Sequence, residues 1–117
     1  MTQDRIQGRL VFGDDATPFR NASIELIVED TTYADGPAVP VARQVLPSVA
    51  YEGERGGSIP FVVHRDSPAS GRRQTLRVLV DVDGDGKLGP GDYRNAHSVP
   101  IPPGSSTDIV VPVLRIR

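Results

Sequence analysis

Short runs of alternating apolar and polar residues recur along the whole chain. In the first run, Ile6, Leu10 and Phe12 fall on one face of an extended chain together with Gly8, and polar residues fall on the other. Helical spacing of apolar residues is nearly absent, whereas a period of two is typical of half-buried β-strands. Similar runs cover residues 23–28, 39–45, 59–64, 76–80, 97–101 and 109–116. The pattern therefore predicts about seven short strands.

Glycine and proline mostly separate these runs, as expected for turns between strands. The 117 residues are enough for one domain. We therefore expect a single all-β domain over residues 1–117, an antiparallel β-sandwich of Greek-key topology, immunoglobulin-like or transthyretin-like. Pro60 and Pro112 fall inside two of the runs. Because proline has no backbone N–H, each should lie on an edge strand or at a bulge.

Composition excludes several classes of function. The chain has no cysteine, so disulfides and thiolate metal sites are excluded. Its net charge is −2 and its basic residues are dispersed, which argues against nucleic acid or an anionic membrane as partner. No apolar run is long enough to span a bilayer. The polar start lacks the apolar stretch of a signal peptide, so we expect a cytoplasmic chain as given, and a periplasmic or secreted one if a leader was removed.

Residues 81–92, with the sequence Asp-Val-Asp-Gly-Asp-Gly-Lys-Leu-Gly-Pro-Gly-Asp, have the spacing of a calcium loop. Ca²⁺ takes six to eight oxygen ligands, and a twelve-residue loop supplies them from positions 1, 3, 5, 7, 9 and 12. Gly86 stands at position 6, where such a loop turns sharply, and Gly89 at position 9 would leave room for a water. The predicted ligands are Asp81, Asp83, Asp85, the backbone carbonyl of Lys87, and Asp92.

These twelve residues resemble the calcium loops of EF-hands and, because the last residue is Asp, of dockerin modules. The flanking residues 76–80 predict a strand instead of the entering helix of an EF-hand. The alternative interpretation is a polar hairpin turn, since Asp-Gly pairs are ordinary turn residues. The loop is longer than a hairpin needs, and its carboxylates would repel one another without a cation. We therefore predict one structural Ca²⁺, with Mg²⁺ disfavoured by its stricter geometry.

The first two thirds of the chain carry a second resemblance. Residues 22–38, followed by 41–44 and 58–61, resemble a bacterial lipoprotein family that includes YbaY-like proteins and the YscW-type pilotins of type III secretion. The likeness covers roughly residues 6–80 and implies a Greek-key β-sandwich. Lipoproteins of this kind carry a cysteine for lipid attachment, which this sequence does not contain.

Other polar residues suggest no chemistry of their own. His64 and His97 stand near no nucleophile motif and are interpreted as solvated side chains. The acidic residues Glu29, Asp30 and Asp35 are interpreted as a solvated turn, with a second cation site as the less favoured alternative.

Three functions remain in order of preference. The first is a non-enzymatic calcium-binding module with a structural ion and a protein-binding or assembly role. The alternative is a pilotin-like or chaperone-like protein that binds a peptide segment at an edge strand. The weakest is a cation-assisted hydrolase, which would need an open coordination position beside a base. Another protein is thus the expected partner.

Overall fold

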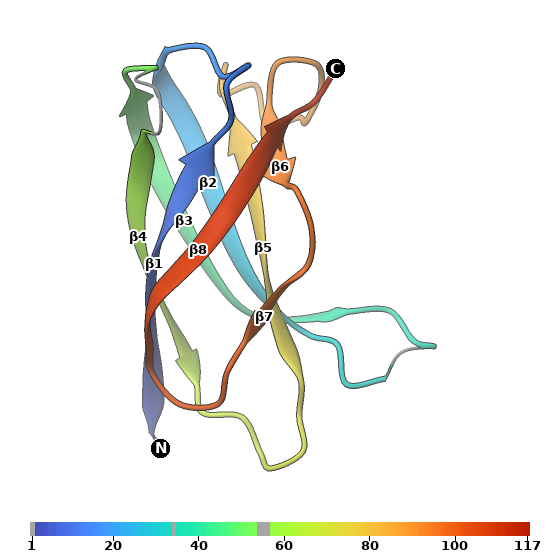
Figure 1. Cartoon of the computed structure of the whole chain (residues 1–117). Helices are drawn as coiled ribbons and strands as arrows, with labels where there is room; N and C mark the ends of the chain where they lie inside the picture. Colours follow the sequence, from blue (N-terminus) through green and yellow to red (C-terminus); the bar gives the residue numbers. More distant parts are fainter. Residues whose placement is uncertain (1, 34, 54–56) are drawn as a thin grey trace.

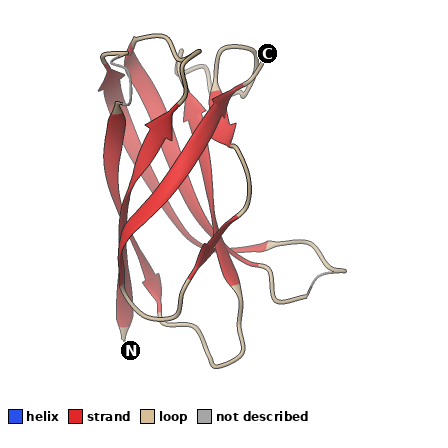
Figure 2. Cartoon of the chain, viewed as in Figure 1, coloured by secondary structure: helices blue, strands red, loops and turns tan. Residues whose placement is uncertain are grey.

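The computed structural model describes residues 2–33, 35–53 and 57–117, and these form eight β-strands without a helix (Figures 1 and 2). Hydrogen bonds join seven of them into one sheet in the order β3-β2-β5-β6-β8-β1-β4, and β7 pairs with β5. None of the described residues forms a helix that could span a membrane. The strands are β1 (Gln3–Phe12), β2 (Phe19–Asp30), β3 (Val39–Tyr51), β4 (Ser58–Asp66), β5 (Gln74–Asp81), β6 (Tyr93–Asn95), β7 (Val99–Ile101) and β8 (Ser106–Arg115).

The sheet is folded over on itself, so that β4, β1 and β8 lie in front of β3, β2 and β5 (Figure 1). The inward residues of both layers form one core, because alternate residues of a strand point to the same face. The terminal strands β3 and β4 approach each other but are not hydrogen-bonded. The core includes the fully buried side chains of Ile6, Leu10, Ile24, Leu26 and Val80.

The prediction of an all-β domain is confirmed, but the strands are arranged differently from the prediction. The described residues form eight strands in one continuous sheet, and β1 pairs with β8 in parallel, so the sheet is not purely antiparallel. The predicted Greek-key sandwich is not confirmed. The extra strand, β6, has only three residues, which is too short to give a recognisable alternation in the sequence.

Gly8 allows the parallel pair to form. It lies opposite Ile109 of β8, and a Cβ built on it would stand 1.9 Å from the Ile109 carbonyl oxygen. The pairing shifts register between Ile6 and Gly8, and Asp108 beside the contact has a φ of 64°. A glycine is needed at this position because the backbone of β8 occupies the space of a side chain.

The two strand prolines have different surroundings. Pro60 lies on β4, an edge strand, as predicted. The prediction for Pro112 is wrong, because β8 lies between β6 and β1. The carbonyl of Pro112 accepts the N–H of Ala96, so its nitrogen faces the β6 side of the strand. The pairing of β6 with β8 ends at the next residue, Val113, and no ladder donor is required there.

A buried arginine joins the ends of several strands. Arg65 of β4 is 2% exposed and lies 3.4 Å from the Asp4 carboxylate of β1. Its guanidinium donates to Gln74 Oε1 (2.7 Å) and to the carbonyls of Pro102 (2.6 Å) and Gly104 (3.0 Å). The network holds the connection between β7 and β8 beside the start of β1, which places β8 for its parallel pairing.

Candidate functional site

The loop predicted to bind calcium joins β5 to β6 at the end of the molecule where the C-terminus lies (Figure 1). Asp81 is the last residue of β5. At the other end, the Gly91 N–H donates to the Ile116 carbonyl (2.9 Å) and the Ile116 N–H donates to the Asp92 carbonyl (2.7 Å). The loop is therefore held at both ends by the sheet and by the C-terminal segment.

Three of its aspartates converge. One carboxylate oxygen from each of Asp81, Asp83 and Asp85 lies within 4.8 Å of the others. Two oxygens that each bind one Ca²⁺ at about 2.3–2.6 Å can be at most about 5 Å apart, so these oxygens are close enough to share one ion. In the described parts of the chain, no other group of three acidic or histidine side chains converges in this way.

Backbone N–H groups of the loop point at the same carboxylates. Asp81 accepts from Gly84 (3.0 Å) and Gly86 (2.8 Å), and Asp85 accepts from Lys87 (2.9 Å). Gly84 and Gly86 have φ values of 69° and 80°, a conformation that favours glycine. A carboxylate has about four lone-pair sites, so these hydrogen bonds leave oxygens able to bind a cation.

The pKa values of the first two aspartates move in opposite directions. Burial raises the pKa of Asp81, but hydrogen bonds, led by the Gly86 N–H and the side chain of Asp83, outweigh burial and hold that pKa below 3.8. The pKa of Asp83 is raised, mainly because its carboxyl shares a hydrogen bond with Asp81, and also by burial and by Asp85. Negative charge is thus crowded at the centre of the loop.

Asp92, the predicted last ligand, has a different environment. It is 5% exposed, and its two oxygens accept the N–H groups of Val82 (2.8 Å) and Gly89 (2.9 Å). It is not among the three converging carboxylates. In this structure Asp92 therefore closes the loop through hydrogen bonds. Lys87, whose backbone carbonyl is the other predicted ligand, is exposed.

The other residues considered from the sequence lie apart from this loop. Glu29 lies 4.0 Å from Arg77, and Asp30 lies 3.6 Å from Arg72. These two carboxylates are thus paired with separate arginines, while Asp35 is exposed in the loop between β2 and β3. The exposed histidines are His64 on β4 and His97, whose Nδ1 lies 3.0 Å from the Ser98 carbonyl.

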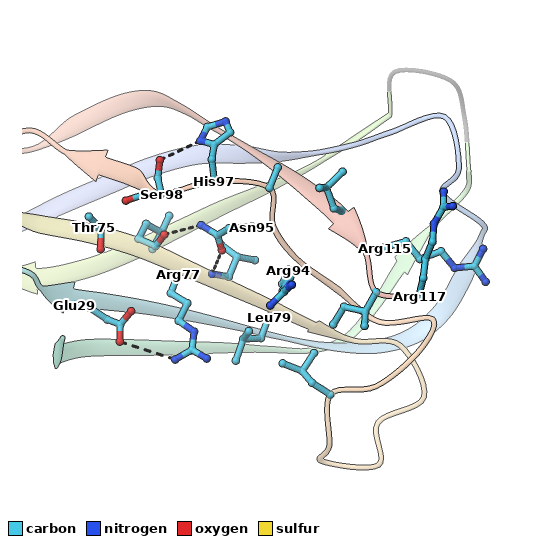
Figure 3. Close-up of a pocket in the computed structure, with 16 residues that line it drawn as sticks. Glu29, Thr75, Arg77, Leu79, Arg94, Asn95, His97, Ser98, Arg115 and Arg117 are labelled. Atoms are coloured by element: carbon cyan, nitrogen blue, oxygen red, sulfur yellow. Dashed lines mark hydrogen bonds and ion pairs between the residues drawn. The ribbon is translucent and has the colours of Figure 1, made fainter. Parts of the chain in front are cut away.

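A second candidate site is a groove that the sequence did not predict. It lies beside β6, between β5 and β8, and has a volume of about 740 Å³ (Figure 3). It forms because β6 has only three residues, after which the chain leaves the sheet before β7 pairs with β5 again. The groove is lined by the apolar Leu79, Leu88, Leu114 and Ile116 and by the arginines Arg77, Arg94, Arg115 and Arg117.

Asn95 fills the gap in the sheet that the short β6 leaves. Its side-chain amide donates to the Leu76 carbonyl (2.8 Å) and accepts the N–H of Val78, both on β5 (Figure 3). These are the bonds that a neighbouring strand would otherwise make. Asn is suited to this role because its short side chain carries both a donor and an acceptor. No periodic pattern in the sequence signals the role.

Comparison with known proteins supports the fold. No protein-family model and no curated protein matches the chain. Among solved structures, the chain is similar to an alternative pilotin from the type II secretion system of Vibrio cholerae, with a TM-score of 0.70 and 17% sequence identity. The match covers 97% of this chain and 99% of the pilotin. The chain therefore has a pilotin-like fold.

Proposed function

We propose that this domain binds a segment of another protein and has no catalytic activity of its own. The observation that carries the proposal is the pilotin-like fold, which extends over nearly the whole of both chains. The resemblance of residues 6–80 to YbaY-like proteins and YscW-type pilotins favours the same class of role. The pilotin-like function, given second place by the sequence, is thus preferred to a function centred on calcium.

Two surfaces could receive such a segment. Strand β3 is 13 residues long, pairs with β2 and no other described strand, and exposes Val39, Val41 and Val45. An edge strand of this kind can accept a further strand through main-chain hydrogen bonds. The groove beside β6 is the other surface, because it combines exposed leucines with arginines.

The proposal is tested by site-specific photo-crosslinking in the cells that make this protein. A benzophenone amino acid is placed at Val41 on β3, at Leu114 in the groove, or at Arg9, an exposed residue of β1 that serves as the control. We expect Val41 or Leu114, but not Arg9, to yield one discrete protein adduct, and the purified adduct partner to bind the purified domain. Absence of any discrete adduct from Val41 and Leu114 would overturn the proposed function.

We further propose that the loop holds one structural Ca²⁺ through Asp81, Asp83, Asp85 and the backbone carbonyl of Lys87. The convergence of three carboxylate oxygens supports this proposal. Ca²⁺ is preferred to Mg²⁺ because it accepts a flexible set of oxygens. Asp83 and Asp85 are exposed, which suits an ion that orders a loop better than one that activates water inside a pocket.

Calcium binding is tested by thermal unfolding with Ca²⁺ and with a chelator. An ion that binds only the folded state adds about 2.7 kcal/mol of stability at a hundredfold excess over its Kd. We expect Ca²⁺ to raise the Tm of the wild-type protein and of the control Asp66→Ala, but not of Asp83→Ala. An unchanged wild-type Tm, together with no heat of binding in calorimetry with millimolar Ca²⁺, would refute the ion site.

A further inference from the structure

The groove beside β6 has the features of a docking site. We propose that it binds an acidic segment of a partner protein, whose carboxylates pair with the groove arginines and whose apolar side chains rest on the groove leucines. The proposal rests on the protein-binding function above and adds to it the location and the chemistry of the bound segment.

The groove is more basic than the rest of the chain. The whole chain has a net charge of −2, yet the groove lining carries four arginines and one glutamate. Arg77 is paired with Glu29 at 4.0 Å, and Arg117 with Asp15 at 3.3 Å. Arg94 and Arg115 have no carboxylate partner within residues 2–33, 35–53 and 57–117. Two unpaired guanidiniums on an acidic protein favour a ligand with carboxylates.

Exposed apolar side chains flank Arg94, which lies opposite Leu79 of β5 and Leu114 of β8. Leu114 is 54% exposed and Leu88 is 41% exposed, and both line the groove with the partly exposed Leu79. Exposed apolar side chains gathered in a concave site mark binding surfaces. Arginine is enriched at protein interfaces and among their strongest contacts. The combination suits an acidic protein segment that also carries apolar anchors.

Asn95 determines which groups of the groove a bound segment can contact. Its amide already uses the Val78 N–H and the Leu76 carbonyl at the gap in the sheet. An incoming chain therefore finds these two main-chain groups of β5 occupied, so adding a strand there would require the amide to be displaced. Recognition in the groove consequently depends on side chains, in contrast to the edge of β3, where main-chain pairing is available.

The apolar lining also favours a peptide over other anionic ligands. Nucleic acid presents a charged backbone along an extended basic stripe, and an anionic membrane presents a broad charged plane. The groove is concave, and its leucines would gain nothing from phosphate groups alone. An acidic segment with apolar side chains can pair with the groove arginines and also pack on the groove leucines.

The test uses fluorescence anisotropy with a labelled synthetic peptide of glutamate and leucine, and two matched peptides with lysine for glutamate or serine for leucine. The full chain carries either Arg94→Glu with Arg115→Glu, or the control pair Arg5→Glu with Arg9→Glu, which makes the same change in charge on β1. We expect the glutamate-leucine peptide to bind the wild-type and control proteins alike, and the groove variant at least about tenfold more weakly. Added salt should weaken binding, because exposed charges are screened.

A second variant tests the apolar contact while leaving the arginines in place. Leu114→Ser should weaken binding of the glutamate-leucine peptide, and circular dichroism should show an unchanged fold because Leu114 is exposed. Equal weakening by the groove and control pairs, equal binding of all three peptides, or binding only to phosphatidylglycerol vesicles would overturn the groove proposal. If photo-crosslinks form at Val41 and not at Leu114, the groove proposal fails while the proposed protein-binding function stands.

Discussion

The four aspartates of the loop carry the same chemical group but differ in their surroundings. Asp81, Asp83 and Asp85 turn carboxylate oxygens toward one another, whereas Asp92 is buried and gives both oxygens to backbone N–H groups. The first three are suited to binding a cation, and the fourth holds the loop closed through hydrogen bonds. Substitutions at the two kinds of position should therefore have different consequences.

Asp92→Ala should destabilise the protein whether or not Ca²⁺ is present. The substitution leaves the N–H groups of Val82 and Gly89 without their acceptor, at a cost of about 1–3 kcal/mol. Denaturant unfolding in Ca²⁺ and in chelator measures the effect. A loss of stability seen only in Ca²⁺ would show instead that Asp92 acts mainly as an ion ligand.

Asp30 should give part of the stability a dependence on pH. Hydrogen bonds from Thr32 lower its pKa below 3.8, burial opposes this, and Arg72 adds to it. Because the folded-state pKa is lowered, the ionised group stabilises the fold above pH 3.8, and this contribution is lost as the pH falls through the lowered value. Asp30→Asn should thus be less stable than the wild-type protein at neutral pH and equally stable in strong acid.

Urea midpoints at neutral pH and in strong acid measure this difference, with the exposed Asp66→Asn as control. The asparagine keeps an oxygen that can accept the Thr32 N–H, so the comparison isolates the charge. An equal deficit at both pH values would show that the charge of Asp30 has no role.

At the scale of elements, β1 and β8 depend on the absence of a side chain at residue 8. Gly8→Ala would put a Cβ against the Ile109 carbonyl oxygen. Neither atom can rotate away, because the backbone fixes the position of each. Overpacking typically costs about 1–3 kcal/mol. The control is Gly36→Ala, where the nearest atom would be 3.8 Å from the new Cβ. Thermal unfolding should show a lower Tm for Gly8→Ala only, and an unchanged Tm for this variant would contradict the close approach.

Some features of these strands and of the loop could be predicted from the sequence, and others could not. Alternation locates the long strands, and the parity of Ile59, Phe61 and Val63 even places Arg65 on the inner face. It could not reveal the parallel pairing of β1 with β8, because strand direction depends on contacts between distant residues such as Arg65 and Pro102. The spacing of the loop aspartates predicts their convergence, but it gives no sign of the hydrogen bonds made by Asp92.

The groove could not be predicted from the sequence for a related reason. Its arginines come from β5, from β6 and from the end of the chain, so they form no cluster in the sequence. The short β6 and the bonds made by the Asn95 side chain become evident only once β5 and β8 are placed in one sheet.

At the scale of the whole molecule, the buried Arg65 holds the folded-over arrangement together. Arg65→Met would remove the guanidinium from Gln74, from two carbonyls and from the Asp4 carboxylate, which would keep the Ser67 hydroxyl as a donor. Removing one partner of a buried ion pair costs about 3–5 kcal/mol. Arg117→Met, which removes an ion pair at the surface, should cost less than about 1 kcal/mol. Denaturant unfolding measures the free energy of unfolding of the two variants. Similar losses of stability would show that the buried network contributes no more than the surface ion pair.

On the folded-over sheet, the groove beside β6 joins apolar side chains to unpaired arginines, and it is the proposed binding site for a protein segment. The most direct measurement is an NMR footprint of the isotope-labelled full chain titrated with the glutamate-leucine peptide. We expect chemical-shift changes concentrated at Leu79, Arg94 and Leu114, with little change along β3. Changes confined to β3 and β4, or no saturable change anywhere, would contradict this expectation.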